Sequence, residues 1–219
     1  MRWGRAVTRS WSRRELLRRG AVVGALGAIP ARVLAQAERN APYVNLTPAE
    51  AATLEAVVAR LVPSDANGPG ALEAGAARYI DRALGDALAA HRPTYAAGLA
   101  ALEGYARATA GAAFSELAPE RQDAVLTDLE QNRATGFTPS SAAFFDLVLG
   151  HTFEGTFGDP HYGGNQGYIG WELLGYPGLA LAVAPDRQRM SAAPAPDYRS
   201  AYDHAQFDAH ATDGERDDD

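Results

Sequence analysis

The 219-residue chain contains no cysteine. Structural disulfides, thiolate metal ligands, a cysteine nucleophile, a lipoprotein anchor and haem attachment through a CxxCH motif are therefore excluded. The chain cannot itself be the electron-carrying cytochrome of a redox complex. Lysine is absent as well, so every basic side chain apart from histidine is an arginine. Together with the many alanines and glycines, this bias is typical of genomic base composition rather than of a function.

The sequence also lacks any sustained alternation of β-branched and polar residues, and it contains no internal repeat. We therefore expect almost no β-sheet. Hydrophobic residues make up 47% of the chain, which is typical of a globular protein rather than a disordered or membrane-embedded one. The length is sufficient for one domain with a sizeable core.

The formal charge of −7 combines two regions of opposite sign. Residues 1–37 contain eight arginines and one acid, a net charge of +7, so the remainder carries −14. Nucleic acids and anionic membrane surfaces would repel such an acidic body. We therefore expect no nucleic-acid partner, and a membrane association only indirectly, through other subunits.

The basic N-terminal region has the order of an export signal. Residues 12–17 read SRRELL and match the twin-arginine pattern S-R-R-x-[FL]-L, an uncharged stretch follows over 20–30, and residues 35–37 form a small-x-small cleavage site. The residues that carry this signal are Arg13, Arg14, Leu16, Leu17, Ala35 and Ala37. The uncharged stretch is about half the roughly 20 residues that a membrane-spanning helix needs. A basic amphipathic helix is the alternative, but the order of basic, apolar and small regions favours the signal.

This signal predicts export to the periplasm by the twin-arginine route, and it removes residues 1–37 from the analysis of the fold. That route is understood to move folded proteins, which suits proteins that acquire a cofactor in the cytoplasm. The chain has no evident cofactor motif of its own. We therefore expect it to accompany a partner that binds one.

Five amphipathic helices are predicted between residues 47 and 149. The first has a capping box, in which Thr47 is the N-cap and Glu50 the N3 residue, and it ends at Pro63. The others are expected over 79–88, from about Pro93 to 106, from Pro119, and from Thr138-Pro139 as cap and first residue through Phe144, Phe145, Val148 and Leu149. Asp81, Arg82 and Asp86 are placed on faces turned to water. The predicted fold is all-α, an irregular helix bundle.

The composition changes at residue 153. Residues 153–178 contain eight glycines among many aromatic residues, so we predict a long loop with its rings buried under the loop or against another chain. We place the helical domain at 38–185 and a polar acidic tail at 186–219. The tail is expected to be disordered, and fully solvated from about residue 205, because its apolar content is too low to offset the entropy of ordering.

Two blocks of residues resemble the gluconate 2-dehydrogenase subunit 3 (gamma subunit) family. The first block is Pro63-Ser64-Asp65, followed by Pro69-Gly70-Ala71, Ala74-Gly75 and Tyr79-Ile80-Asp81. The second, more specific block runs from Gly155 and Phe157 through Asp159-Pro160, Tyr162-Gly163-Gly164-Asn165 and Gly170-Trp171 to Gly175-Tyr176-Pro177-Gly178. The similarity covers roughly residues 46–180 and does not include the acidic tail.

This resemblance implies the function of an accessory subunit. Members of the family accompany a large flavoprotein of the glucose-methanol-choline oxidoreductase type, which oxidises gluconate, glucose, fructose or related polyols. The FAD would therefore lie in the partner and no cofactor in this chain, while a multihaem cytochrome c commonly receives the electrons as a third subunit. The small subunit often carries the twin-arginine signal for both chains, in agreement with the signal found here.

No catalytic, cofactor or metal site is predicted in this chain. The run 163–167 lacks both the spacing and the preceding strand of a dinucleotide fingerprint, and Ser/His/Asp catalysis lacks a G-x-S-x-G elbow. His151, Asp159 and His161 are close in sequence but have no metal-ligand spacing. We expect His151 to lie at a helix end with local hydrogen bonds. His204 and His210 are assigned to the tail.

We call residues 153–178 the Gly-aromatic segment. Its predicted functional residues are partner contacts or loop anchors: Phe157, Asp159, Pro160, Tyr162, Gly163, Gly164, Asn165, Trp171 and Tyr176. Trp171 is expected to be an internal anchor, and Phe157 and Tyr162 to be more exposed. Two other functions remain open. The chain could be a free-standing exported protein whose loop closes over a small ligand such as a sugar, or an independent enzyme.

Overall fold

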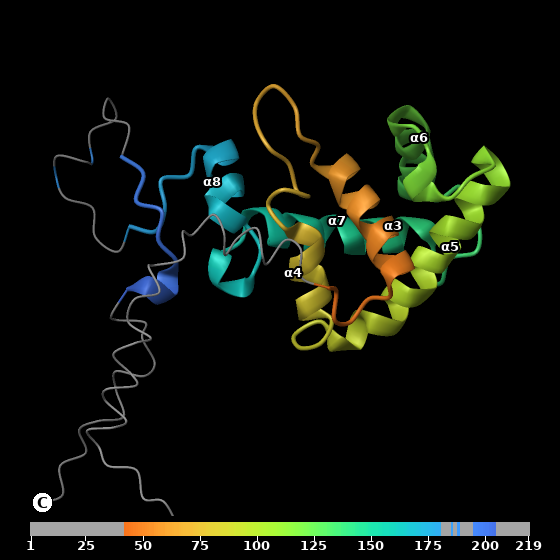
Figure 1. The fold of residues 1–219 in the computed structure, drawn as a ribbon, viewed down its shortest axis with the longest axis horizontal. Coiled ribbons are helices and arrows are strands. Elements are labelled where there is room, and N and C mark those ends of the chain that lie inside the picture. Colours follow the sequence, from red (N-terminus) through yellow and green to blue (C-terminus); the bar gives the residue numbers. More distant parts are fainter. Residues whose placement is uncertain (1–41, 181–184, 186–187, 189–194, 205–219) are drawn as a thin grey trace, which may run out of the picture. The chain divides into compact units, whose positions relative to one another are not determined.

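The computed structural model describes residues 42–180, 185, 188 and 195–204. The predicted export signal, with Arg13, Arg14, Leu16, Leu17, Ala35 and Ala37, lies outside these residues, and so do residues 205–219. The described part contains six α-helices and no β-strand, only an isolated bridge between Asp65 and Gly68 (Figure 1). The predicted all-α class is confirmed. None of the described helices is long and apolar enough to cross a membrane.

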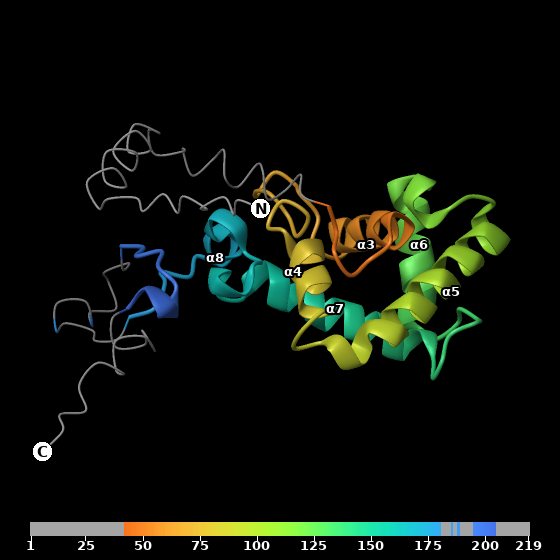
Figure 2. The same cartoon turned by 60° about the horizontal axis from the view of Figure 1, so that its bottom comes forward.

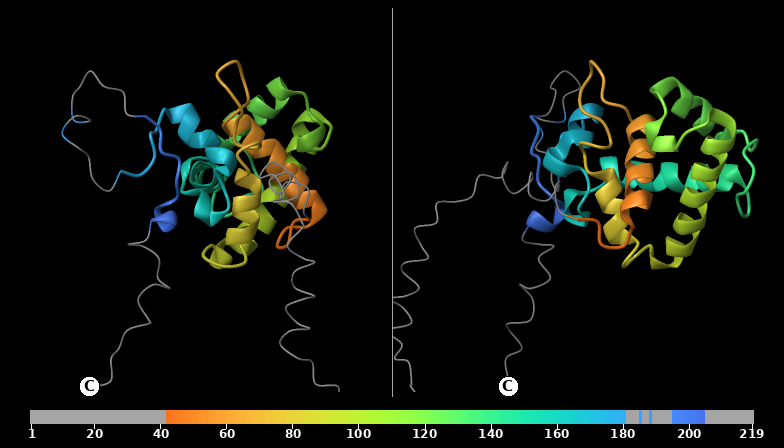
Figure 3. Two further views of the ribbon diagram at one scale, coloured as in Figure 1. Left: turned by 60° about the vertical axis from the view of Figure 1, so that its left-hand side comes forward. Right: turned by 45° about the vertical axis from the view of Figure 1, so that its right-hand side comes forward.

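The α-helices are α3 (Pro48–Leu61), α4 (Ala76–Ala83), α5 (Arg92–Ala110), α6 (Pro119–Glu130), α7 (Ser141–Phe157) and α8 (Ile169–Leu174). Short 3₁₀ turns are η1 (Ala89–His91), η2 (Phe114–Glu116), η3 (Pro160–Tyr162), η4 (Gln166–Tyr168) and η5 (Ala201–Asp203). Helix α7 crosses the others and contacts α3, α4, α5, α6 and α8 (Figures 1 and 2). The right-hand view of Figure 3 shows this crossing behind α3 and α5.

The apolar stripes of the helices meet in one core. Leu54 and Val58 of α3, Ile80 of α4 and Leu102 of α5 are fully buried there. Tyr95 of α5 contacts Phe144 of α7 edge to face, with 6.1 Å between the ring centroids. An edge-to-face pair of this kind adds to the stabilisation from area burial alone.

Helix α3 begins as the sequence predicts. The Thr47 hydroxyl accepts a bond from the Glu50 amide at 3.3 Å, and the Glu50 carboxylate accepts one from the Thr47 amide at 2.8 Å. This reciprocal pair is the predicted capping box. The chain after Pro63 forms turns before α4 begins.

Several predicted helix boundaries are wrong, among them the end of α5, which lies at Ala110 rather than at 106. Helix α7 begins at Ser141 rather than at Pro139, because the Ser140 hydroxyl accepts the Ala143 amide and makes Ser140 the N-cap. The Thr138-Pro139 peptide bond that precedes it is cis. Helix α4 ends at Ala83, so the predicted helix to residue 88 is interrupted by turns.

The segment 153–178 is less of a loop than predicted. Helix α7 continues to Phe157, and α8 forms over Ile169–Leu174. Small side chains let α7 approach its neighbours: Gly155 lies so close to α4 that an added Cβ would be 2.8 Å from the Tyr79 ring. The helical period continues through Phe157 because glycine is tolerated in a helix when packing compensates for its entropy.

Two glycines of α5 allow a direct test of this close packing. A Cβ at Gly98 would lie 2.2 Å from the Phe144 ring, whereas a Cβ at Gly104 would meet nothing within 4 Å. We expect Gly98→Ala to lower the free energy of unfolding by about 1 to 3 kcal/mol through overpacking. Gly104→Ala is the matched control and should raise it by up to about 1 kcal/mol through helix propensity. Urea unfolding would measure both, and equal effects at the two positions would contradict the packing of α5 on α7.

Candidate functional site

The Gly-aromatic segment folds around a buried asparagine. Asn165 is 0% exposed. Its side-chain amide donates to the Gly158 carbonyl at 2.9 Å, and its side-chain oxygen accepts the Gly170 amide at 2.8 Å. Its own backbone amide donates to the Gly155 carbonyl at 2.7 Å. These bonds join the end of α7 to the start of α8.

Trp171 anchors the same region from α8. Its indole is 6% exposed and donates to the Phe157 carbonyl at 3.0 Å. The Tyr176 ring packs against it edge to face, with centroids 5.1 Å apart. Trp171 is thus an internal residue, as we expected, and an indole that is both buried and hydrogen-bonded is a rigid support for the chain around it.

The glycine pair between these anchors is required by close backbone contact. A Cβ at Gly164 would lie 2.2 Å from the Gly155 carbonyl oxygen, and Gly163 has a φ of +89°. Either position would be strained by a larger residue. The glycines of the motif therefore have a structural reason to be there that does not involve a phosphate or any other ligand.

Residues 195–204, which we had assigned to the polar tail, pack on this segment. The Asp159 carboxylate accepts the His161 amide at 2.9 Å and the Ala201 amide at 2.8 Å. The Tyr198 ring stacks on Tyr168 with centroids 5.4 Å apart. The prediction of a disordered tail from residue 186 is therefore wrong for residues 195–204, which are packed.

Asp159 is the residue that connects the two segments. Burial by itself would raise the pKa of its carboxyl, but the bonds from the Ala201 amide, the Ser200 side chain and the His161 amide together lower that pKa below its ordinary value. The ionised form is thus favoured in the folded protein. Asp159 and Pro160 act in the fold, Asp159 as the N-cap of η3 and Pro160 as its first residue.

Three rings form an exposed cluster at this junction, which we call the ring cluster: His161, Tyr162 and Tyr202. His161 stacks on Tyr202 with centroids 3.8 Å apart. The Tyr162 and Tyr202 hydroxyls lie 2.7 Å apart, and this bond raises the pKa of Tyr162. The side chains of Tyr162 and Tyr202 are 57% and 44% exposed. Tyrosine at such a position combines apolar area with a hydrogen-bonding tip, which suits a protein interface.

The other predicted contact residues differ in exposure. Tyr176 is partly exposed, like Tyr162. Phe157 is only half-buried, and its ring packs edge to face on the exposed ring of Phe153 at 5.8 Å between centroids. The structure thus brings the predicted residues together in one region, where Asn165, Gly164 and Trp171 form the interior and Tyr162 and Tyr176 the surface.

His151 is not at a helix end, and that expectation is wrong. It lies within α7, is buried, and its Nδ1 is 3.0 Å from the Tyr95 hydroxyl. Burial lowers its pKa, so the neutral ring is favoured in the folded protein. No group of three His, Asp or Glu side chains in the described part of the chain could hold a metal ion. His151 is a core residue bonded to α5.

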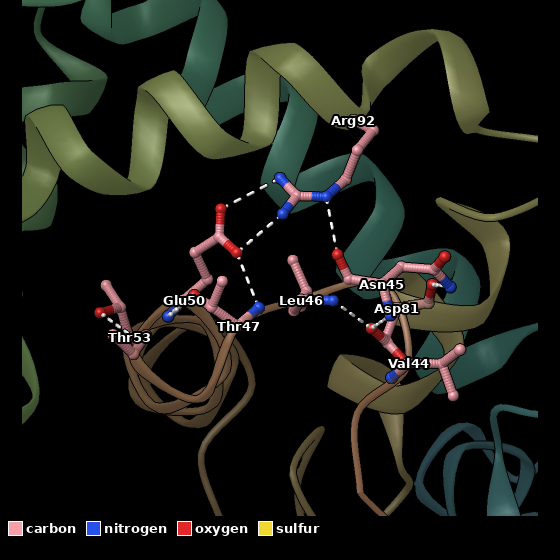
Figure 4. A network of polar contacts seen from close by, with 9 residues as sticks. Val44, Asn45, Leu46, Thr47, Glu50, Thr53, Asp81 and Arg92 are labelled. Atoms are coloured by element: carbon pink, nitrogen blue, oxygen red, sulfur yellow. Dashed lines mark hydrogen bonds and ion pairs between the residues drawn. The ribbon is translucent and has the colours of Figure 1, made fainter.

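Asp81 is the functional candidate that sequence reasoning missed. It was placed on a face turned to water, yet it is 3% exposed. Its carboxylate accepts the backbone amides of Val44, Asn45 and Leu46, each at 2.8 Å (Figure 4). A helical periodicity cannot reveal a partner that lies 35 residues away. The one signal was its place in the block Tyr79-Ile80-Asp81 that carries the family resemblance.

A shallow groove of about 440 Å³ lies between α3 and α5. Alanines, among them Ala52, Ala96 and Ala100, line much of it. Its polar side chains already bond to one another: the Thr53 hydroxyl donates to the Glu103 carboxylate at 2.8 Å, and Arg107 is 3.4 Å from that carboxylate. The groove could admit a small molecule, but it offers few unengaged polar groups.

Comparison with protein families identifies the family of the chain. The family described as gluconate 2-dehydrogenase subunit 3 matches residues 48–178. The chain belongs to this family. No curated protein and no solved structure showed significant similarity to it.

The family match extends from the first residue of α3 to the last glycine of the Gly-aromatic segment. In this member of the gluconate 2-dehydrogenase subunit 3 family, the match includes Asp81, Asp159 and Asn165. It does not include residues 44–46, whose amides bind Asp81, or Ala201, whose amide binds Asp159. The match thus contains the acceptors of both contacts but not the segments held by them.

We expect Asp159→Asn to release residues 195–204, because an amide cannot accept from the Ala201 and His161 backbones through two equivalent oxygens. The loss should be about 1.5 to 3 kcal/mol, the range for a hydrogen bond to a charged group. Hydrogen exchange at the Ala201 amide would measure it. Asp146→Asn, an exposed change on α7, is the matched control. Undiminished protection of Ala201 in Asp159→Asn would show that the carboxylate does not hold the segment.

Proposed function

We propose that this protein is the non-catalytic small subunit of a periplasmic or membrane-associated FAD-dependent dehydrogenase that oxidises gluconate or a related sugar or alcohol. In this role it stabilises a large flavoprotein of the glucose-methanol-choline type and provides the twin-arginine signal that exports both chains. The FAD lies in the flavoprotein, and a multihaem cytochrome c subunit is a possible third component. The observation that carries the proposal is membership of the subunit 3 family over residues 48–178.

Membership of a family of dehydrogenase subunits implies a larger catalytic partner. The ring cluster is a suitable contact for that partner, because Tyr162 and Tyr202 are exposed while the amides of the residues before them, His161 and Ala201, are held by Asp159. Rigid tyrosines on a preorganised backbone lose little entropy on binding. Binding a partner there would bury both rings.

The export role predicts a dependence on the two arginines of the signal. We expect Arg13→Lys with Arg14→Lys to leave this chain, the flavoprotein and the dehydrogenase activity in the cytoplasm, since the pattern requires both arginines. Cell fractionation with activity staining would measure the distribution. Leu16 and Leu17 stay unchanged, so the hydrophobic part of the signal remains intact. A flavoprotein that still reached the periplasm would exclude the escort role.

The contact role predicts a dependence on the ring cluster. We expect Tyr162→Ala with Tyr202→Ala to weaken binding to the flavoprotein at least about tenfold, in the range of interface hot spots. Titration calorimetry with the purified flavoprotein would measure the affinity, and thermal melting would show that the bundle is intact. Arg121→Ala on the exposed surface of α6 is the control. Equal affinities for the double variant and the control would place the interface elsewhere.

A free-standing exported protein that binds a small ligand is the second candidate, favoured by the groove between α3 and α5. Co-expression with and without a flavoprotein of the glucose-methanol-choline type separates the two functions. The accessory role requires a stoichiometric complex with FAD absorbance. A colourless monomer that ignores the flavoprotein would favour the ligand-binding role.

A further inference from the structure

The residues that follow the predicted signal are held unusually firmly. We call Tyr43–Leu46 the N-terminal strap. The Asp81 carboxylate accepts three consecutive amides of the strap, and the Asn45 side chain donates back to the Asp81 carbonyl at 2.7 Å. Leu46 is buried in the core. The first residues of a domain are usually poorly ordered unless such contacts hold them.

Other helices add to this grip. The Arg92 guanidinium of α5 donates to the Asn45 carbonyl at 2.7 Å and binds the Glu50 carboxylate through both of its terminal nitrogens (Figure 4). The Tyr43 hydroxyl donates to Glu55 of α3 at 2.6 Å, and the Arg78 guanidinium of α4 lies 4.6 Å from the centre of the Tyr43 ring. Contacts from α3, α4 and α5 therefore meet on four residues.

These contacts exist only in the folded protein. Asp81 is 35 to 37 residues from the amides that it binds, and Arg92 is 47 residues from Asn45. In an unfolded chain no local interaction would bring them together, because closing such loops costs entropy that only tertiary packing offsets. The strap is thus bound only after α4 and α5 have packed against α3.

The strap also lies next to the signal in the sequence. Residues 38–42 alone separate the predicted cleavage site at Ala37 from Tyr43. When the body is folded, the strap contacts therefore fix the chain from Tyr43 onward, and in the unfolded chain they do not form.

We propose that the Asp81 contact makes export conditional on folding, since it fixes Val44, Asn45 and Leu46, which are close in sequence to the signal, only when the helices have packed. This inference rests on the twin-arginine signal of the proposed function. Asp81 is a positioning residue here, which acts through the backbone of the strap. The contact would keep an unfolded subunit from entering the export route.

The test is Asp81→Asn in the full chain with an intact signal, co-expressed with the flavoprotein. An amide presents one acceptor oxygen and one NH₂ donor, so it opposes the Val44 amide with another donor. We expect faster hydrogen exchange at the Val44, Asn45 and Leu46 amides and at least a fivefold fall in the exported fraction in pulse-chase fractionation. Asp86→Asn, exposed just beyond α4, should change neither.

A second control separates release of the strap from general loss of stability. Leu126→Ala in α6 lowers stability by removing core volume far along the chain from the strap. We expect Leu126→Ala to keep the strap amides protected from exchange and to be exported normally, even if it lowers Tm as much as Asp81→Asn does. Equal export of the two variants would overturn the inference. Unchanged exchange at the strap in Asp81→Asn would overturn it too.

Asn45→Ala is a second variant that tests the proposal if Asp81→Asn does not fold. It removes the bond to the Asp81 carbonyl but keeps the three amides on the carboxylate, so we expect partial release and an intermediate fall in export. Release of the strap without any fall in export would contradict the proposal. This outcome differs from failure of the proposed function, in which Arg13→Lys with Arg14→Lys would still allow export.

Discussion

The close approach of α7 to its neighbours is the constraint on which the rest of the structure depends. Gly98 leaves space for the Phe144 ring, and Gly155 leaves space for α4 beside Tyr79. Because α7 also contacts α3, α6 and α8, it fixes the bundle and the start of the Gly-aromatic segment together. The bonds that Asn165 donates to the Gly155 and Gly158 carbonyls then connect α7 to the segment that follows it.

Much of the bundle could be predicted because its signals are local. The capping box at Thr47 and Glu50 depends on residues three apart, and the apolar stripe of α3 depends on helical spacing. The start of α7 was predicted too early because Thr138-Pro139 imitates a cap, whereas Ser140 provides the real one. The end of α7 was predicted too early because glycine content suggests a loop, while the packing that tolerates Gly155 is tertiary.

The candidate site was predicted in part for the same reason. The density of rings and glycines located the segment and the internal place of Trp171. The partners of Asp81 and Asp159 could not be predicted, because their acceptor oxygens bind backbone amides that lie 35 to 42 residues away and carry no side-chain signature. The ring of Tyr202 was missed because it follows a polar stretch of low apolar content.

The packing of residues 195–204 also bears on where this protein can be divided. A fragment that stopped at Gly178, where the family match ends, would uncover the face of Tyr168 on which Tyr198 stacks. It would also leave the Asp159 oxygen that binds Ala201 facing water. Such a fragment would expose aromatic area that the whole chain covers. The packed structure therefore extends beyond the family boundary.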